Sequence, residues 1–152
     1  RDEALEHAAL EHFQKQSIFE LLQVVYQTPV NRGYLGSFTP VVVRLAEEGN
    51  QTCRTLLDNA GQQLGLLAAA VVERLGMIEE PCRVGACGGV FAAGKVILNP
   101  MQKVLSQRAP LASVSLPDFP PVVGALIMGY ETLGITPAEV VPGLEQWVER
   151  GN

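Results

Sequence analysis

The sequence has 152 residues, of which 47% are hydrophobic and 18% charged, and its net charge is −5. The length suits one domain, the composition excludes a disordered chain, and the charge argues against nucleic acid as the main partner. No apolar run approaches the about 20 residues of a membrane-spanning helix, and no signal peptide is visible. Three cysteines, Cys53, Cys82 and Cys87, form no C-x-x-C pair. We therefore expect a cytoplasmic protein with no nucleic-acid and no membrane partner.

The first half of the chain, residues 1–76, is predicted to be helical. Four features predict helix starts. An apolar pattern begins at residue 3, and Ser17 and Glu20 form a capping box. Asn31 is a candidate cap, and Pro40 suits the first turn of a helix. These signals predict several short helices before the longest one.

Asn50 is predicted to cap the longest helix, residues 51–75. Its apolar residues recur at spacings of three and four and predict one apolar stripe, formed by Leu57, Ala60, Leu64, Leu67, Val71 and Leu75. The stripe is widened by Leu56, Ala68, Ala69, Ala70 and Val72, which predicts burial on more than one side. Gly61 and Gly65 each lower the intrinsic stability of a helix, so we expect a packing reason for them, such as a close helix crossing.

The second half, residues 77–152, is predicted to alternate strands and helices. The expected elements are strands at 83–87 and 112–116, a helix at 97–107 with a break at Asn99-Pro100, and a helix from Pro120-Pro121 to about residue 133. A capping box at Thr136 and Glu139 starts a closing helix, on which Val140, Leu144 and Trp147 are expected to face inward. Two strands that flank a helix should be parallel, with a right-handed connection.

Two parallel strands do not form an independent sheet, because parallel sheets need further strands and cover on both faces. No other stretch of the sequence predicts a strand with the same clarity. We therefore expect the chain to be part of a larger α/β protein, or to pair with another chain. A complete sheet within these residues would contradict that expectation.

Residues 81–95 combine a short strand, the Gly88-Gly89 pair and the start of a helix. Glycine lets the backbone approach a ligand closely, and N–H groups at a helix start attract phosphate. Residues 89–95 nearly fit the P-loop pattern G-x-x-x-x-G-K, but Val96 stands where a Ser or Thr should hold Mg²⁺. The alternative is a tight turn with no ligand.

The chain resembles the C-terminal half of the BadF/BadG/BcrA/BcrD ATPase family, which includes N-acetylglucosamine kinases. The similar segments are a Val-Tyr helix end at 21–26, Ala-Glu-Glu-Gly-Asn at 46–50, Leu-Asp-Asn-Ala-Gly at 57–61, Ala-Cys-Gly-Gly-Val-Phe at 86–91 and Pro-Pro-Val-Val-Gly-Ala-Leu at 120–126. Asn50 replaces the usual Asp of the second segment, and Cys87 replaces the Ala of the family's adenosine motif. Each motif alone is weak, and their order and spacing carry the resemblance.

The resemblance implies a single C-terminal ATPase domain over residues 1–152. Its fold would be α/β: a partial ribonuclease-H-like domain of the actin and hexokinase type, helix-rich, with a small parallel sheet and an inserted helical segment. ATP or ADP would be the cofactor, bound by Gly88, Gly89 and Val90 at the ribose and α-phosphate, with Phe91 near the adenine. Partners would be the N-terminal half of the same ATPase and a second copy in a homodimer.

The family's phosphate loops and its sugar-directed carboxylate have no counterpart in this sequence. The resemblance therefore implies that Mg²⁺ is held mainly by the absent half, and that no catalytic and no metal-binding residue lies here. The function expected is the nucleotide-binding half of an ATP-dependent sugar kinase, inactive as this chain alone. Two alternatives stay open: a helical dimerisation module without ligand, and the activator ATPase of a CoA-ester dehydratase. Those activators bridge an iron–sulfur cluster with cysteines, whereas Cys82 and Cys87 are expected within one strand, which favours the kinase.

Overall fold

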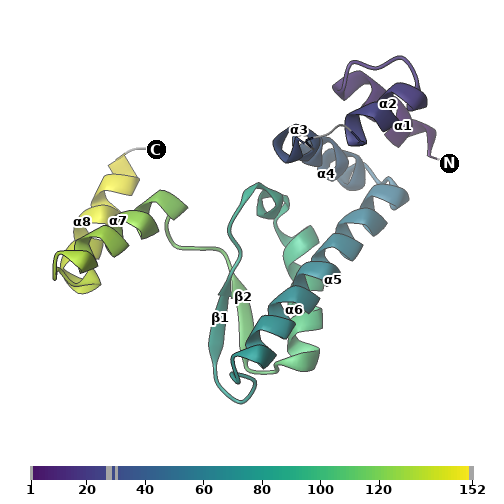
Figure 1. Ribbon diagram of the computed structural model, residues 1–152. Helices are drawn as coiled ribbons and strands as arrows, with labels where there is room; N and C mark the ends of the chain where they lie inside the picture. The colour runs from purple at the N-terminus through teal and green to yellow at the C-terminus, as the bar shows by residue number, and fades with distance from the viewer. Residues whose placement is uncertain (1, 27–28, 30, 151–152) are drawn as a thin grey trace. The chain divides into compact units, whose positions relative to one another are not determined.

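The computed structural model describes residues 2–26, 29 and 31–150, and of residues 145–150 the backbone alone. The elements are α1 (Glu3–His12), α2 (Ile18–Val25), α3 (Arg32–Gly36), α4 (Thr39–Glu47), α5 (Gln51–Arg74), β1 (Cys82–Gly85), the 3₁₀ helix η1 (Gly89–Ala93), α6 (Lys95–Arg108), β2 (Ala112–Ser115), α7 (Pro121–Thr132) and α8 (Pro137–Arg150) (Figure 1). The chain forms two compact units. The first holds residues up to 84 and 88–114, and the second holds 85–87 and the residues from 115 on.

The structure confirms the predicted helix starts. The side chains of Ser17, Asn31 and Asn50 accept hydrogen bonds from the backbone N–H groups of Glu20, Tyr34 and Cys53, at 3.3, 2.9 and 2.9 Å. In the first capping box the Glu20 carboxylate accepts the N–H of Gln16 at 3.2 Å. Each bond satisfies one of the N–H groups that a helix start leaves without an internal partner.

The buried face of α5 differs from the predicted stripe. It consists of Cys53, Leu57, Gly61, Gly65, Ala69 and Val72, so Leu57, Ala69 and Val72 of the predicted stripe are fully buried. Leu67, Val71 and Leu75 are 65%, 57% and 66% exposed. The prediction was wrong for Leu67, Val71 and Leu75, because the small residues Gly61, Gly65 and Ala69 define the buried face of α5.

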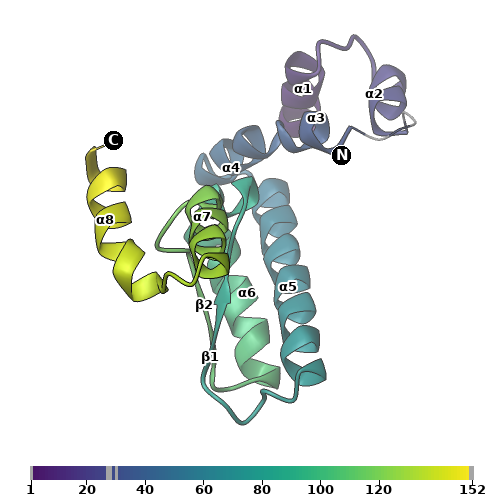
Figure 2. The same ribbon diagram turned by 60° about the vertical axis from the view of Figure 1, so that its left-hand side comes forward.

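The predicted close crossing at the two glycines is confirmed. The helices α5 and α6 lie side by side (Figures 1 and 2). A Cβ at Gly61 would lie 2.5 Å from the Pro100 Cγ atom and 2.6 Å from the Ile97 carbonyl oxygen. A Cβ at Gly65 would lie 2.6 Å from the Met101 carbonyl oxygen. Such distances are far below van der Waals contact, so the missing side chains allow the two backbones to touch.

The predicted break at Asn99-Pro100 is wrong, because α6 runs without interruption from Lys95 to Arg108. Pro100 lies in the second turn and is buried, with its ring against Gly61. A proline inside a helix costs one hydrogen bond and crowds the preceding turn. Here its ring fills the space that Gly61 leaves open, and this packing offsets part of that cost.

The sheet contains two parallel strands, β1 and β2, within the described residues. At their carboxyl ends β1 is two residues and β2 one residue shorter than predicted, so Cys87 lies beyond β1 in an exposed loop rather than in a strand. One cluster covers a face of the sheet: Ala69 and Val72 of α5, Leu105 and Ala109 next to Ala112, with Cys82, Val84 and Val114 packed against them.

The outer edge of β2 is occupied by a side chain. The Ala86 N–H donates to the Ser115 carbonyl at 2.8 Å, which places Ser115 on the edge facing β1 and Val114 on the opposite edge. There the Gln102 amide accepts the Val114 N–H at 2.6 Å and donates to the Ala112 carbonyl at 3.2 Å. Gln102 therefore takes the place of a further strand beside β2.

The second unit contains α7 and α8. Gly134, at φ +79°, ends α7, and the Ile135 N–H donates to the Tyr130 carbonyl at 3.1 Å. The predicted capping box is present, since the Glu139 carboxylate accepts from the Thr136 N–H and hydroxyl at 2.8 Å each. Val140 and Leu144 are half-buried, and the prediction for the Trp147 side chain lies outside what the structure describes.

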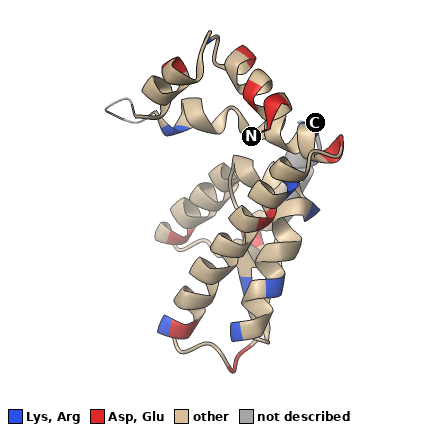
Figure 3. Ribbon diagram, turned by 90° about the vertical axis from the view of Figure 1, so that its right-hand side faces the viewer, with Lys and Arg blue, Asp and Glu red and all other residues tan. Residues whose placement is uncertain are grey.

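Charged residues are scattered over the helices, with no element carrying a row of Lys and Arg among the residues drawn in colour (Figure 3). None of the described helices is long and apolar enough to cross a membrane.

The N-termini of α1 and α5 are joined through their caps. The Asp2 carboxylate accepts the Leu5 N–H at 3.0 Å, and the Asn50 side-chain amide donates to both Asp2 oxygens at 3.1 and 3.0 Å. Hydrogen bonds from Leu5, Thr52 and Asn50 lower the pKa of Asp2 below its ordinary value of 3.8. The ionised carboxylate is therefore the form that the fold favours.

We predict that Gly61→Ala destabilises the fold by about 1–3 kcal/mol in urea unfolding, because the added methyl group overpacks the crossing. Gly36→Ala is the matched control, since nothing lies within 4 Å of a Cβ there. In that helix alanine should be neutral or stabilise by about 0.4–1 kcal/mol. Equal effects of the two substitutions would contradict the close crossing.

We also predict that Asp2 makes stability depend on pH. Because its folded-state pKa is lowered, its contribution is fully present above the ordinary value of 3.8 and is lost as the pH falls through the lower folded-state pKa. The difference in unfolding free energy between the wild type and Asp2→Ala should therefore shrink on acidification. Asn50→Ala should weaken the same pH dependence, and a difference that stays constant with pH would contradict this role.

Candidate functional site

The predicted glycine site is a turn between β1 and α6. Gly88 adopts φ +120° and ψ 164°, a backbone conformation that favours glycine, and the Phe91 N–H donates to its carbonyl at 3.1 Å. The chain then winds through η1 instead of entering an α-helix directly. Gly94, at φ +62°, separates η1 from α6. The turn is thus defined by two left-handed glycines.

A hollow of about 190 Å³ lies between this turn and α4. Its lining residues are Thr39, Pro40, Val43, Arg44 and Glu47 from α4, with Gly89, Ala92 and Ala93 from η1. Pro40, Val43, Ala92 and Ala93 make its walls mainly apolar, while Arg44 and Glu47 add one charge of each sign. Ligand pockets for whole drug-sized molecules are about 300–1,000 Å³, so this hollow suits a single flat ring.

The charged residues of the hollow are exposed and adjustable. The Arg44 guanidinium pairs with the Glu48 carboxylate at 2.9 Å, and both side chains are more than half exposed. An exposed pair of this kind contributes about 0–1 kcal/mol, so a ligand can displace it at little cost. Arg44 can therefore stack on an aromatic ring through its planar guanidinium.

The structure brings only part of the predicted site to this hollow. Gly89 lines it, and Gly88 sets the turn beside it. Phe91 is only 9% exposed and does not line the hollow, and neither does the half-buried Val90. The α4 residues were missed, although a signal existed: Pro40, Val43, Arg44 and Glu47 follow the i, i+3, i+4, i+7 spacing of one helix face.

The P-loop interpretation finds no support in the geometry. A P-loop leaves successive backbone N–H groups free to hold phosphate. Here residues 89–93 form η1, in which the Phe91 N–H donates to Gly88, and the Gly94 N–H donates to Phe91 at 2.9 Å. The Val96 side chain also has no hydroxyl oxygen to offer a metal ion.

The positions of the cysteines do not favour a sugar kinase over the activator ATPase of a CoA-ester dehydratase. The expectation that Cys82 and Cys87 share one strand is wrong, because Cys87 is exposed in the loop after β1. Cys53 is fully buried, and burial raises the pKa of its thiol. In the described part of the chain, no three His, Cys, Asp or Glu side chains gather as a metal site would require.

A comparison of the sequence with models of known protein families found no match, and neither did a search of curated proteins.

We predict that Gly88→Ala lowers stability by about 1–2 kcal/mol in urea unfolding, because a side chain at φ +120° is strained even in open space. The adjacent Gly89→Ala is the matched control. Nothing lies within 4 Å of a Cβ at Gly89 either, and its φ is not in the left-handed region. Gly89→Ala should leave the midpoint unchanged or raise it, and a loss equal to that of Gly88→Ala would contradict the assigned turn.

Proposed function

We propose that the chain is the nucleotide-binding C-terminal half of an ATP-dependent sugar kinase of the BadF/BadG/BcrA/BcrD type. The observation that carries the proposal is the hollow between α4 and η1, which lies beside the glycine turn of the adenosine-like motif. The motif, residues 86–91, and the hollow share only Gly89, because the other residues that line the hollow come from α4 and from Ala92 and Ala93.

In this proposal the hollow holds the adenine ring. Val43 and Ala92 contact its faces, Arg44 stacks on it, and Glu47 accepts a hydrogen bond from its exocyclic amino group. The ribose can approach the backbone at Gly89, because this residue has no side chain and no other atom lies within 4 Å of the position that a Cβ would take. ATP supplies the phosphoryl group for transfer to a sugar hydroxyl. The groups that polarise it and hold Mg²⁺ belong to the absent N-terminal half.

The arrangement of the two strands supports the larger fold proposed here. Gln102 closes the outer edge of β2, whereas within the described residues no strand lies beside the other edge of β1. Strands from the N-terminal part would therefore join at β1 and complete a ribonuclease-H-like sheet. This proposal extends the observed two-stranded α/β unit and gives the sheet the further strands that a parallel sheet needs.

A second candidate function is a dimerisation module without ligand. It rests on the second apolar face of α5, where Leu56, Leu67, Val71 and Leu75 are 48–66% exposed. Of these residues Leu67, Val71 and Leu75 follow one another at four-residue spacing along α5, and exposed apolar patches mark interaction sites. The two functions are compatible, because a nucleotide-binding unit can also dimerise.

The test is thermal unfolding with ADP, in Mg²⁺ and in chelator. A ligand that binds only the folded state at ten times its Kd stabilises by about 1.4 kcal/mol, which corresponds to a rise in Tm of roughly 3–6 °C for a chain of this size. We expect a rise that survives chelation, because the metal ligands lie elsewhere.

The control separates binding from folding. Gly89→Val should abolish the rise by filling the mouth of the hollow, whereas Gly36→Val, at an equally open glycine, should retain it. Valine and glycine differ little in helix propensity, so both variants should fold. No rise with ADP, or an equal rise in Gly89→Val, would overturn the adenine site and leave the dimerisation module. A rise that requires Mg²⁺ would contradict the assignment of the metal ligands.

A further inference from the structure

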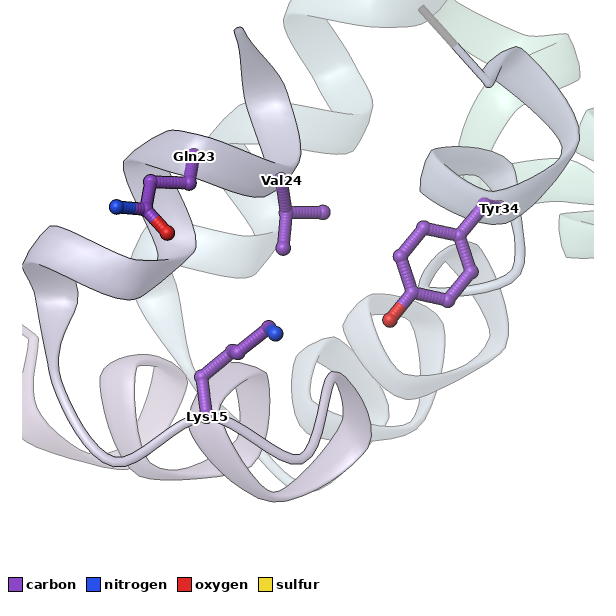
Figure 4. A pocket seen from close by; sticks show the side chains of 4 residues that line it. All are labelled: Lys15, Gln23, Val24 and Tyr34. Carbon is purple, nitrogen blue, oxygen red and sulfur yellow. The ribbon is translucent and has the colours of Figure 1, made fainter. Parts of the chain in front are cut away.

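A second hollow lies among α1, α2 and α3, away from the glycine motif in the sequence. It has a volume of about 270 Å³ and is lined by Lys15, Gln23, Val24 and Tyr34 (Figure 4). The Lys15 ammonium and the Tyr34 hydroxyl point into the same space in front of Val24, while Gln23 lies at its edge. None of these residues belongs to the proposed nucleotide site.

The backbone after α1 fixes the position of Lys15. Gln14 adopts φ +53°, the one non-glycine residue in the described chain with a positive φ. The Gln14 N–H donates to the Glu11 carbonyl at 3.1 Å, and the Lys15 N–H donates to the Leu10 carbonyl at 2.9 Å. This is the Schellman pattern, in which glycine is usual at the left-handed position. The turn directs the half-buried Lys15 toward α2 and α3.

Tyr34 is held from two sides. Asn31 caps α3 by accepting the Tyr34 N–H at 2.9 Å. The Tyr34 ring meets the ring of Phe13 edge to face, with centroids 5.2 Å apart. Phe13 is buried and also contacts Phe38 at 5.4 Å. Phe13 and Phe38 therefore support the Tyr34 ring from one side, and the Tyr34 hydroxyl points into the hollow.

The lining offers hydrogen-bond donors and one positive charge. An ammonium, a phenol and an amide can all donate, and none of the four lining residues is acidic. The nearest acidic residue along α2, Glu20, has its carboxylate engaged with the Gln16 N–H. In a chain of net charge −5, such a hollow selects a small anion with oxygen acceptors.

The floor of the hollow narrows the ligand class. Val24 is 8% exposed and presents its methyl groups between the two polar ends. A free phosphate has no apolar part to place there, whereas a small organic carboxylate has one. We propose that this hollow binds a small organic carboxylate, with its oxygens on Lys15 and Tyr34 and its short apolar body on Val24.

The test is a titration followed by ¹H–¹⁵N NMR on the whole chain at constant ionic strength. The probes are isobutyrate, its neutral amide and inorganic phosphate, each to about 50 mM, a range that detects millimolar Kd values. We expect isobutyrate to shift the backbone signals of Lys15, Val24 and Tyr34 along saturable curves. The amide and phosphate should bind at least about tenfold more weakly, since each lacks one of the two recognised parts.

Two variants locate the binding. Lys15→Met keeps the apolar stem and removes the charge, and it should weaken isobutyrate binding at least about tenfold. Tyr34→Phe keeps the ring against Phe13 and removes one donor, and it should weaken binding about threefold. Lys103→Met, at an exposed lysine of α6, is the matched control and should bind as the wild type does.

Several outcomes would overturn the inference. These are shifts that rise linearly without saturation, unchanged binding in Lys15→Met, binding of the amide as tight as that of isobutyrate, and binding of phosphate as tight as that of isobutyrate. The last result would make the hollow a simple anion site. Because Gly89 takes no part here, failure of this test is distinct from failure of the nucleotide test.

Discussion

The contact between the backbones of α5 and α6 determines the arrangement of the first unit. Gly61 and Gly65 allow the Ile97 and Met101 carbonyls within distances that no side chain would permit. Because the contacts advance in the same direction along both helices, α5 and α6 run parallel to each other. The element before α5 and the element before α6 therefore meet at one end. These elements are α4 and η1, and the hollow between them follows from the helix crossing.

The same crossing explains why the sheet can be so small. Each of the two helices is followed by a strand, so the parallel helices place β1 and β2 side by side and in the same direction. Ala69, Ala109 and Ala112 keep the cluster between helices and sheet thin, with Leu105 filling its centre. Gln102 then hydrogen-bonds the outer edge of β2, and this protects backbone groups that an edge strand would otherwise leave open to incorrect pairing.

Local signals in the sequence predicted the local structure well, and the errors arose where packing between elements decides. Ser17, Asn31 and Asn50 cap their helices as predicted, because a cap is a contact between residues three apart. Pro100 did not break α6, because Gly61 of another helix makes room for its ring. Leu67, Val71 and Leu75 of α5 were wrongly expected to be buried for a related reason: a hydrophobic scale favours Leu67 over Gly65, although the small residue makes the closer contact. Phe91 was expected beside a ligand, but it is buried in the core. The sequence alone does not distinguish an aromatic residue of the core from one that contacts a ligand.

The closed edge of β2 gives the glycine turn its place in any larger sheet. A strand can be added beside β1 but not beside β2, where Gln102 holds Ala112 and Val114. On extension, β1 would become an interior strand and β2 the outermost one. Ligands in open α/β sheets bind beyond the carboxyl ends of interior strands, where the chain turns into a helix. Gly88 and Gly89 lie just beyond the carboxyl end of β1, after Ala86 and Cys87. The turn that carries the proposed nucleotide site is therefore the one that sheet extension would bring to the centre.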